Sequence, residues 1–310
     1  MIKPKQLKKG DCIGLLAPSG PVDDTSVIHD MVEGLKNLGF FVKEAKCCYE
    51  KYGYLAGKDQ ERADDVNSFF QDKSIDGILC MKGGYGASRI LDLLDYDAIA
   101  KNPKVFIGYS DITALHLALN KKCRMVTFHG PVGYDVAGEF DAYTKAFFLK
   151  AVMSDEPIGQ MFNPQEREIL FLYGGKAKGS IIGGNLSLVA GTIGTPYEID
   201  TKGKLLLLED IGEEPYRVDR MLMQLQMSGM LSDCNGIILG DWKNCDPEHP
   251  EKSLSLNEIF TDILLPLRKP IIHNVAAGHC KQKLTVPFGV EALLDADACT
   301  VTVTESAVIK

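Results

Sequence analysis

Ser110 stands where a hydroxyl group could do chemistry. It follows an apolar run in "KVFIGYSDIT", residues 104–113, and the residues after it look like the start of a helix. A tight strand-to-helix turn exposes the nucleophile of many hydrolases, and the next backbone N–H joins an oxyanion hole at the positive helix end. The usual pattern is Gly-x-Ser-x-Gly, whereas here Gly108 is present but Ile112 occupies the last position. An N-cap role for Ser110 or Asp111 is more common at such a junction than a nucleophile, so position alone does not decide between the two roles.

A second turn follows another apolar run in the same way. In "MKGGYGASRI", residues 81–90, Gly83, Gly84 and Gly86 allow the backbone to turn sharply and approach a ligand. The stretch matches neither of the two glycine patterns that bind nucleotide phosphates, so a nucleotide site has little support. Neighbouring strand ends lie side by side in a parallel sheet. The N–H groups of Gly83 or Gly84 could therefore face Ser110 and stabilise an oxyanion.

A serine nucleophile also needs a base and an acid that orients the base. Two histidines are candidates for the base: His129 in "TFHGPV", at a strand end of the same predicted sheet, and His279, beside Gly278 on a predicted loop. Glu209 ends the run "LLLLED", where a buried strand would orient its carboxylate. The remaining histidines are expected to be structural or solvated: His29, His116, His249 and His273. Residue types alone leave the triad open.

The composition indicates a soluble globular protein large enough for two domains. The chain has 310 residues, of which 45% are hydrophobic and 25% charged, and its formal net charge is -8. It lacks a basic cluster interleaved with aromatic residues, so we expect no nucleic-acid partner. The apolar run at 13–17 is too short for a signal peptide or a membrane span, and we expect a cytoplasmic protein. Nine cysteines without Cys-x-x-Cys spacing predict reduced thiols.

Apolar runs alternate with stretches of helical periodicity over residues 1–150. The expected strands are 11–19, 41–47, 75–84, 104–110 and 125–132, and the expected helices are 23–40, 59–72, 87–95, 111–122 and 142–154. This alternation predicts an α/β domain with a mostly parallel sheet flanked by helices, and with ligands at the carboxyl ends of its strands.

The pattern changes after residue 150. Residues 151–175 are rich in Pro, Gly and charge and predict a linker. Residues 176–310 predict a smaller, strand-rich α/β domain, with strands at 204–210, 236–242 and 299–306 and helices at 218–231 and 256–267.

Nine stretches of the chain resemble the LD-carboxypeptidases, a family of serine peptidases that includes the microcin C immunity peptidases. In order, they are "GLLAPSGP", "YLAGKDQERADDVN", "MKGGYGASRILDLLDYD", "FIGYSDITALHLAL", "TFHGPV", "GGNLSLVAGTIGTPYEID", "LLLLEDIGEEPYRVDRMLMQL", "GIILGDW" and "AAGHCKQKLTVPFG". The resemblance extends over nearly the whole chain.

This resemblance implies a Ser-Glu-His triad divided between two domains. Position by position, Ser110 matches the nucleophile of the N-terminal domain, Glu209 the orienting acid and His279 the base of the C-terminal domain. Glu213 and Glu214 follow Glu209 closely in "EDIGEEPY" and are the alternative acids.

The resemblance also implies an oxyanion hole made of backbone N–H groups at Gly83, Gly84 and Asp111. His129 then has a structural role. Neither a metal nor a cofactor is required, because the serine and the histidine carry out both halves of an acyl-enzyme reaction.

The usual substrate in this family is a murein tetrapeptide, whose terminal D-alanine is removed from the L-centre of a diamino acid. Arg89, beside the glycine turn, is a candidate for binding the free carboxylate, with a surface salt bridge as its alternative role. The other branch of the family cleaves peptidyl or aminoacyl adenylates and would need an aromatic shelf. Trp242, the one tryptophan, lies in a predicted strand end and not in an obvious lid.

Partners follow from these expectations. We expect a small peptide substrate and neither nucleic acid nor membrane, and a homodimer is left open. A catalytically inactive sensor of muropeptides or nucleotides is the alternative outside enzymes.

Overall fold

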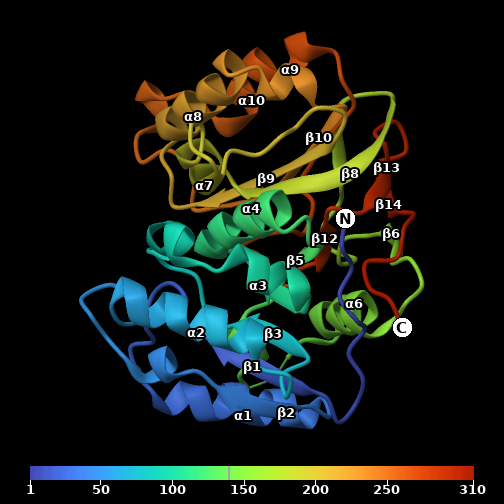
Figure 1. Ribbon diagram of the computed structural model, residues 1–310. Helices are drawn as coiled ribbons and strands as arrows, with labels where there is room; N and C mark the ends of the chain where they lie inside the picture. The colour runs from blue at the N-terminus through green and yellow to red at the C-terminus, as the bar shows by residue number, and fades with distance from the viewer. Residues whose placement is uncertain (139) are drawn as a thin grey trace. The chain divides into compact units, whose positions relative to one another are not determined.

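The computed structural model describes residues 1–138 and 140–310, and its chain divides into two compact units. The first unit contains Met1–Pro157, Thr285–Gly289 and Ser306–Lys310, and the second contains Ile158–Leu284 and Val290–Glu305. Each unit has its own sheet (Figure 1).

The sheet of the first unit has six strands. In order across the sheet they are β12 (Val286–Phe288), β5 (Thr127–His129), β4 (Val105–Gly108), β3 (Gly77–Cys80), β1 (Cys12–Leu16) and β2 (Phe41–Glu44). All neighbours are parallel except β12, which pairs antiparallel with β5. The chain therefore runs outward from β1 to β2 on one side and from β3 to β4 on the other. The carboxyl ends of β1 and β3 form the switch point at which such sheets usually bind ligands.

Helices flank this sheet, as the alternating pattern predicts (Figure 1). The α-helices are α1 (Ser26–Asn37), α2 (Asp59–Gln71), α3 (Tyr96–Lys101), α4 (Thr113–Lys122), α5 (Gly133–Val136) and α6 (Ala142–Met153). In α1 the buried residues Ile28, Met31, Val32 and Leu35 recur at helical spacing, so one face packs onto the core. The short 3₁₀ helices are η1 (Lys46–Tyr49), η2 (Ala87–Leu93) and η3 (Ser110–Ile112).

The second unit is built on an eight-stranded mixed sheet. Its order is β6 (Gly159–Met161), β14 (Thr300–Val303), β13 (Glu291–Asp295), β8 (Lys176–Asn185), β9 (Leu205–Ile211), β10 (Gly236–Lys243), β11 (Ile271–His273) and β7 (Leu170–Tyr173). The central strands β8 to β11 are parallel, and the outer pairs are antiparallel.

Four α-helices and two 3₁₀ helices accompany this sheet: α7 (Leu186–Gly191), α8 (Pro215–Met227), α9 (Met230–Asp233), α10 (Leu256–Leu264), η4 (Pro250–Lys252) and η5 (Leu265–Leu267). Helix α8 follows β9 and begins with a proline at a position whose missing N–H costs no helical hydrogen bond. Its buried residues Val218, Leu222 and Leu225 form the face that packs inward.

The chain differs from the expected elements and boundaries in three respects. Residues 151–175 contain the end of α6 and the strands β6 and β7, because short segments rich in Pro and Gly can still pair at the outer positions of a sheet. The last part of the chain also returns to the first unit, where β12 pairs with β5. The segment expected as a helix at 87–95 is the 3₁₀ helix η2.

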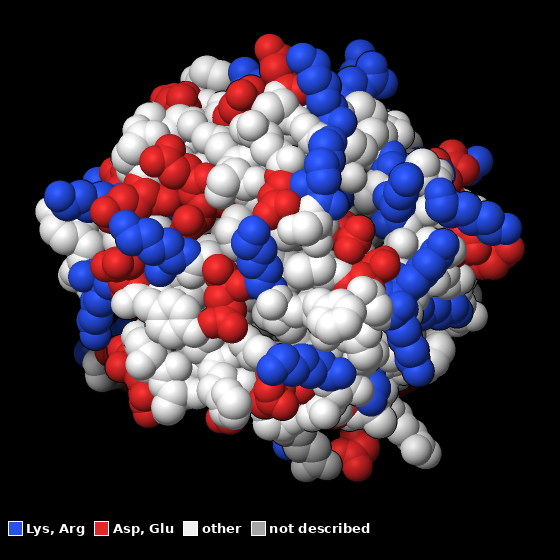
Figure 2. Space-filling view, turned by 60° about the horizontal axis from the view of Figure 1, so that its bottom comes forward, with Lys and Arg blue, Asp and Glu red and all other residues white. Residues whose placement is uncertain are grey.

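The surface carries charges of both signs. On the face shown in Figure 2, Lys and Arg side chains are interspersed with Asp and Glu. Among the described residues, the helices are all too short or too polar to cross a membrane.

Candidate active site

Ser110 lies directly after β4, at the corner where η3 leads into α4. Its backbone φ is +65°, in the left-handed region that a serine rarely adopts. The N-cap positions of η3 and α4 are Tyr109 and Ile112, so neither Ser110 nor Asp111 is the N-cap residue of α4. A strained strand-to-helix turn is the geometry of a nucleophile elbow, which Ser110 therefore resembles more than a helix cap.

The glycine turn after β3 approaches this corner closely. A Cβ atom at position 83 would lie 2.7 Å from the Cβ of Ser110 and 2.9 Å from its Oγ, so only a glycine fits there. The same point is 3.3 Å from the backbone nitrogen of Asp111. In the hydrogen-bond pattern of the described residues, the N–H groups of Gly83, Gly84 and Asp111 do not act as donors to the backbone. The hydroxyl and these backbone segments thus meet at the carboxyl ends of β3 and β4.

The side chain of Asp111 forms hydrogen bonds with the loops that follow β1 and β3. It is 2% exposed, and its Oδ2 accepts hydrogen bonds from Ser19 Oγ (2.5 Å) and from the backbone N–H of Ala87 (2.8 Å). Burial raises the pKa of Asp111, while these two hydrogen bonds act in the opposite direction. The carboxylate thereby ties the ends of β1 and β3 to the serine corner. Sequence reasoning considered Asp111 as a helix N-cap and as a backbone oxyanion donor, and it missed Ser19, whose signal was its place in "APSGP" after the first strand.

A buried arginine secures the same loops. Arg62 in α2 is fully buried, and its guanidinium donates to the carbonyl oxygens of Pro18 (2.5 Å) and Gly86 (2.9 Å) and to Asp59 (2.5 Å). Asp59 also receives Arg89 in a bidentate contact, with distances of 2.7 to 3.1 Å. Arg89 therefore forms a salt bridge with Asp59, which is the alternative role expected for it from the sequence. Sequence reasoning also missed Arg62, which it quoted only as part of "YLAGKDQERADDVN".

In the second unit, Glu209 and His279 form a hydrogen-bonded pair. His279 Nδ1 lies 2.7 Å from Oε2 of Glu209, and the two side chains are 11% and 0% exposed. A carboxylate only accepts, so Nδ1 carries the proton in this pair and Nε2 is left as the basic nitrogen. Burial raises the pKa of Glu209, and the hydrogen bond with His279 works against that rise.

A glycine makes this pairing sterically feasible. Gly278 has a φ of +116°, and a Cβ atom there would lie 2.5 Å from Oε2 of Glu209. The two alternative acids have other partners: Glu213 lies 3.6 Å from Arg217, and Glu214 accepts the backbone N–H of Glu248. Of the three carboxylates considered from the sequence, the structure pairs Glu209 with His279.

The neighbouring carboxylate, Asp210, has a positioning role that the sequence did not reveal. It is 2% exposed and accepts from the side-chain amide of Asn185 (2.8 Å), and from the backbone N–H (3.0 Å) and hydroxyl (2.8 Å) of Ser187. These contacts fix the carboxyl end of β9, on which Glu209 stands, to the junction of β8 and α7. The motif "GGNLSLVAG" contains both partners.

Two buried histidines of the first unit, His129 at the end of β5 and His116 in α4, are packed among rings. His129 is 1% exposed, with its ring centroid 5.4 Å from that of Phe288 and 6.1 Å from that of Tyr109. His116 is fully buried and donates from Nε2 to the carbonyl of Gly108 at 2.8 Å. Burial lowers the pKa of His116 to about 4. These surroundings fit the structural role expected for both.

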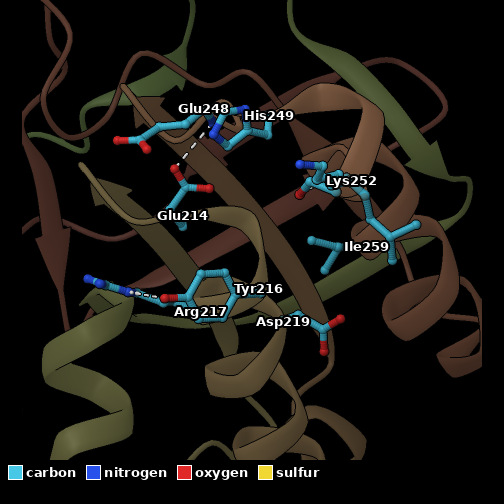
Figure 3. Close-up of a pocket in the computed structure, with 10 residues that line it drawn as sticks. Glu214, Tyr216, Arg217, Asp219, Glu248, His249, Lys252 and Ile259 are labelled. Atoms are coloured by element: carbon cyan, nitrogen blue, oxygen red, sulfur yellow. Dashed lines mark hydrogen bonds between the residues drawn. The ribbon is translucent and has the colours of Figure 1, made fainter.

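A cavity of about 540 Å³ opens beyond the end of β9. Figure 3 shows its border, which carries carboxylates and cations: Glu214, Asp219, Glu248, Arg217 and Lys252. Part of its border is formed by residues 214–219, which follow Glu209 closely in the chain. Trp242 packs against Phe260, with ring centroids 5.1 Å apart, and is not part of this cavity.

Comparison with known proteins gives a consistent result. The sequence profile of the LD-carboxypeptidase N-terminal domain matches residues 13–130, and that of the C-terminal domain matches residues 178–294. A probable murein peptide carboxypeptidase of Bacillus subtilis is 42% identical over 94% of this chain and 91% of its own length. A solved structure of the microcin C7 self-immunity protein MccF, an inactive mutant without ligand, is 27% identical with a TM-score of 0.93 and covers 100% of both chains. The muramoyltetrapeptide carboxypeptidase of Oxalobacter formigenes is 28% identical with a TM-score of 0.83, covering 96% of this chain and 100% of its own.

Proposed function

The chain belongs to the LD-carboxypeptidase family of peptidases, and we propose that it is a serine carboxypeptidase that releases the terminal D-alanine of a murein tetrapeptide. The nucleophile is Ser110, the base is His279 and the orienting acid is Glu209. The bond cleaved joins the L-centre of the diamino acid to D-alanine.

The reaction follows from the proton inventory of these three side chains. His279 Nε2 accepts the proton of Ser110 as Oγ attacks the carbonyl carbon, and the imidazolium then returns a proton to the nitrogen of the leaving D-alanine. Glu209 stabilises the imidazolium through Nδ1. Water repeats the sequence on the acyl-enzyme and restores Ser110. Backbone N–H groups at Gly83, Gly84 and Asp111 receive the negative charge of the tetrahedral intermediate.

The observation that carries the proposal is the buried hydrogen bond between Glu209 and His279. It fixes one imidazole tautomer at a place where a carboxylate would otherwise pay the cost of burial without a partner. The strained backbone of Ser110, facing a glycine that admits no side chain, supplies the nucleophilic half.

The test is incubation of the purified protein with a disaccharide tetrapeptide and measurement of released D-alanine. We expect stoichiometric release of D-alanine together with the tripeptide. The variant Ser110→Ala should release none while retaining the thermal unfolding temperature. Cleavage at another bond, or an unchanged rate in Ser110→Ala, would contradict the proposal.

One observation favours a second substrate class. The fold is highly similar to that of MccF, for which the TM-score is 0.93. Hydrolysis of an aminoacyl adenylate analogue should therefore be measured beside that of the tetrapeptide. A higher kcat/KM for the adenylate would move the assignment to the microcin-immunity branch, whereas tight ligand binding by wild-type protein without turnover would indicate a sensor.

A further inference from the structure

A small pocket lies at the switch point of the first unit's sheet, between the carboxyl ends of β1 and β3. Its volume is about 360 Å³, and it is lined by residues after β1, including Gly20 and Asp23, and by Lys82, Gly84 and Tyr85 after β3. Gly84 borders this pocket, and the preceding residue, Gly83, faces Ser110. The pocket therefore begins one residue away from the point that contacts the proposed nucleophile.

Two tyrosines limit the size of the pocket. The rings of Tyr54 and Tyr85 meet edge to face with centroids 5.5 Å apart, although the residues are 65% and 51% exposed. An exposed aromatic pair beside a cationic side chain is typical of a ligand-binding wall more than of a core. The volume of about 360 Å³ lies at the lower end of the range for ligand pockets.

Lys82 is the cation best placed in this pocket. Its side chain is half-buried, and Nζ lies 5.7 Å from the ring centroid of Tyr134, which steadies the side chain through a cation–π contact. Among the residues that the structure describes, no carboxylate forms an ion pair with Lys82. Lys51, which also lines the pocket, lies 3.9 Å from Asp23 and is 60% exposed.

Arg89, the cation expected from the sequence to bind the substrate carboxylate, is engaged by Asp59 through a bidentate contact. A carboxylate ligand would have to displace that partner. Lys82 carries no such cost, and it directly precedes the glycine turn.

We propose that Lys82 binds the C-terminal carboxylate of the leaving residue, and that Tyr54 and Tyr85 bound the pocket that receives this residue. In a carboxypeptidase substrate, the free carboxylate lies one residue beyond the scissile carbonyl. Adjacent Cα atoms are about 3.8 Å apart. Lys82 therefore stands one residue from the proposed oxyanion donor Gly83, just as the substrate carboxylate stands one residue from the scissile carbonyl. A longer peptide presents a neutral amide at this point, which leaves Lys82 partly desolvated and unpaired. Lys82 thereby makes the enzyme an exopeptidase.

This inference rests on the proposed function, and its test separates the two. The substrates are the disaccharide tetrapeptide with a free terminal carboxylate and the same compound with a terminal carboxamide. Wild-type protein should prefer the acid by about 10- to 100-fold in kcat/KM, as expected for one charge-assisted hydrogen bond. Failure to release D-alanine from the acid would overturn the proposed function, whereas equal rates on acid and amide would overturn only the role of Lys82.

Variants locate the selectivity. Lys82→Met should lower kcat/KM for the acid by about 10- to 100-fold, mostly through KM, and leave the amide within about 3-fold, so the preference collapses. Lys82→Arg should retain most of the preference. Lys36→Met is the matched control, because Lys36 pairs with Glu33 on the exposed face of α1. An equal loss on both substrates in Lys82→Met, or an intact preference in a folded Lys82→Gln, would refute the role of Lys82.

Discussion

His279 Nδ1 lies 2.7 Å from Oε2 of Glu209, a carboxylate that is fully buried. Nδ1 of the histidine faces this anion, and the side chain of His279 is 11% exposed. A buried glutamate with a raised pKa is an unfavourable feature for stability alone. Its presence at the end of β9 is best understood through the proton that it fixes on His279.

This relationship predicts that the two residues contribute unequally to catalysis. His279→Ala should lower kcat by roughly 10⁴- to 10⁶-fold, because it removes the base, whereas Glu209→Gln should cost less, because an amide can still hold the ring. The measurement is steady-state release of D-alanine by each variant. Glu213→Gln serves as the control. A larger loss of kcat in Glu213→Gln than in Glu209→Gln would show that Glu209 is not the orienting acid.

Gly83→Ala should inactivate the protein without unfolding it. The new methyl group would lie 2.7 to 2.9 Å from the side chain of Ser110 and would displace either the hydroxyl or the turn. Loss of one oxyanion donor costs roughly 10²- to 10³-fold in kcat, and we expect at least that. Gly191→Ala is the matched control, because nothing lies within 4 Å of its added Cβ. An active Gly83→Ala would show that the turn does not contact the reacting atoms.

Much of the fold was predictable, because each strand of the first unit except β12 is followed or preceded by a local helical pattern. The apolar residues at 28, 31, 32 and 35 alone define α1. Strand β12 was not predictable, because Val286–Phe288 is three residues long and its partner β5 lies over 150 positions earlier in the chain. Pairing of that kind depends on tertiary contacts that no local pattern records.

The candidate site divides in the same way. Ser110, Gly83 and His279 could be selected from the sequence, because each lies beside or close to a glycine at a predicted turn or loop. The hydrogen bond from Ser19 to Asp111 joins residues that are 92 positions apart, and neither residue type marks a partner in the sequence. Arg89 has the charge needed to bind a carboxylate and lies beside the glycine turn. The sequence does not show that Asp59, 30 positions earlier, binds its guanidinium.

His116 should make stability depend on pH. Its pKa is lowered from 6.5 to about 4 by burial, so below pH 6.5 the unfolded chain binds a proton that the folded protein does not bind until about pH 4. Stability is therefore lost as the pH falls through this window, by about 3 kcal/mol from this group. Urea unfolding at pH 7, 5.5 and 4 measures the loss. His116→Gln retains a donor for the carbonyl of Gly108 and should flatten the profile, and an unchanged slope would rule out His116 as the cause.

The last prediction concerns the division of the triad between the two units. Ser110 belongs to the first unit, and Glu209 and His279 belong to the second. If His279 activates Ser110, a fluorophosphonate probe should label Ser110 in the wild-type protein.

The labelling rate should fall by on the order of 10³-fold or more in His279→Ala, since the hydroxyl then loses its base. His29→Ala, which alters an exposed histidine on α1, should label like the wild type. Saturating tetrapeptide should slow labelling of the wild type, because substrate and probe compete for the same oxygen. Rapid labelling in His279→Ala would mean that another base serves Ser110, and labelling should then be repeated in His129→Ala, because His129 lies on the neighbouring strand of the same sheet as Ser110.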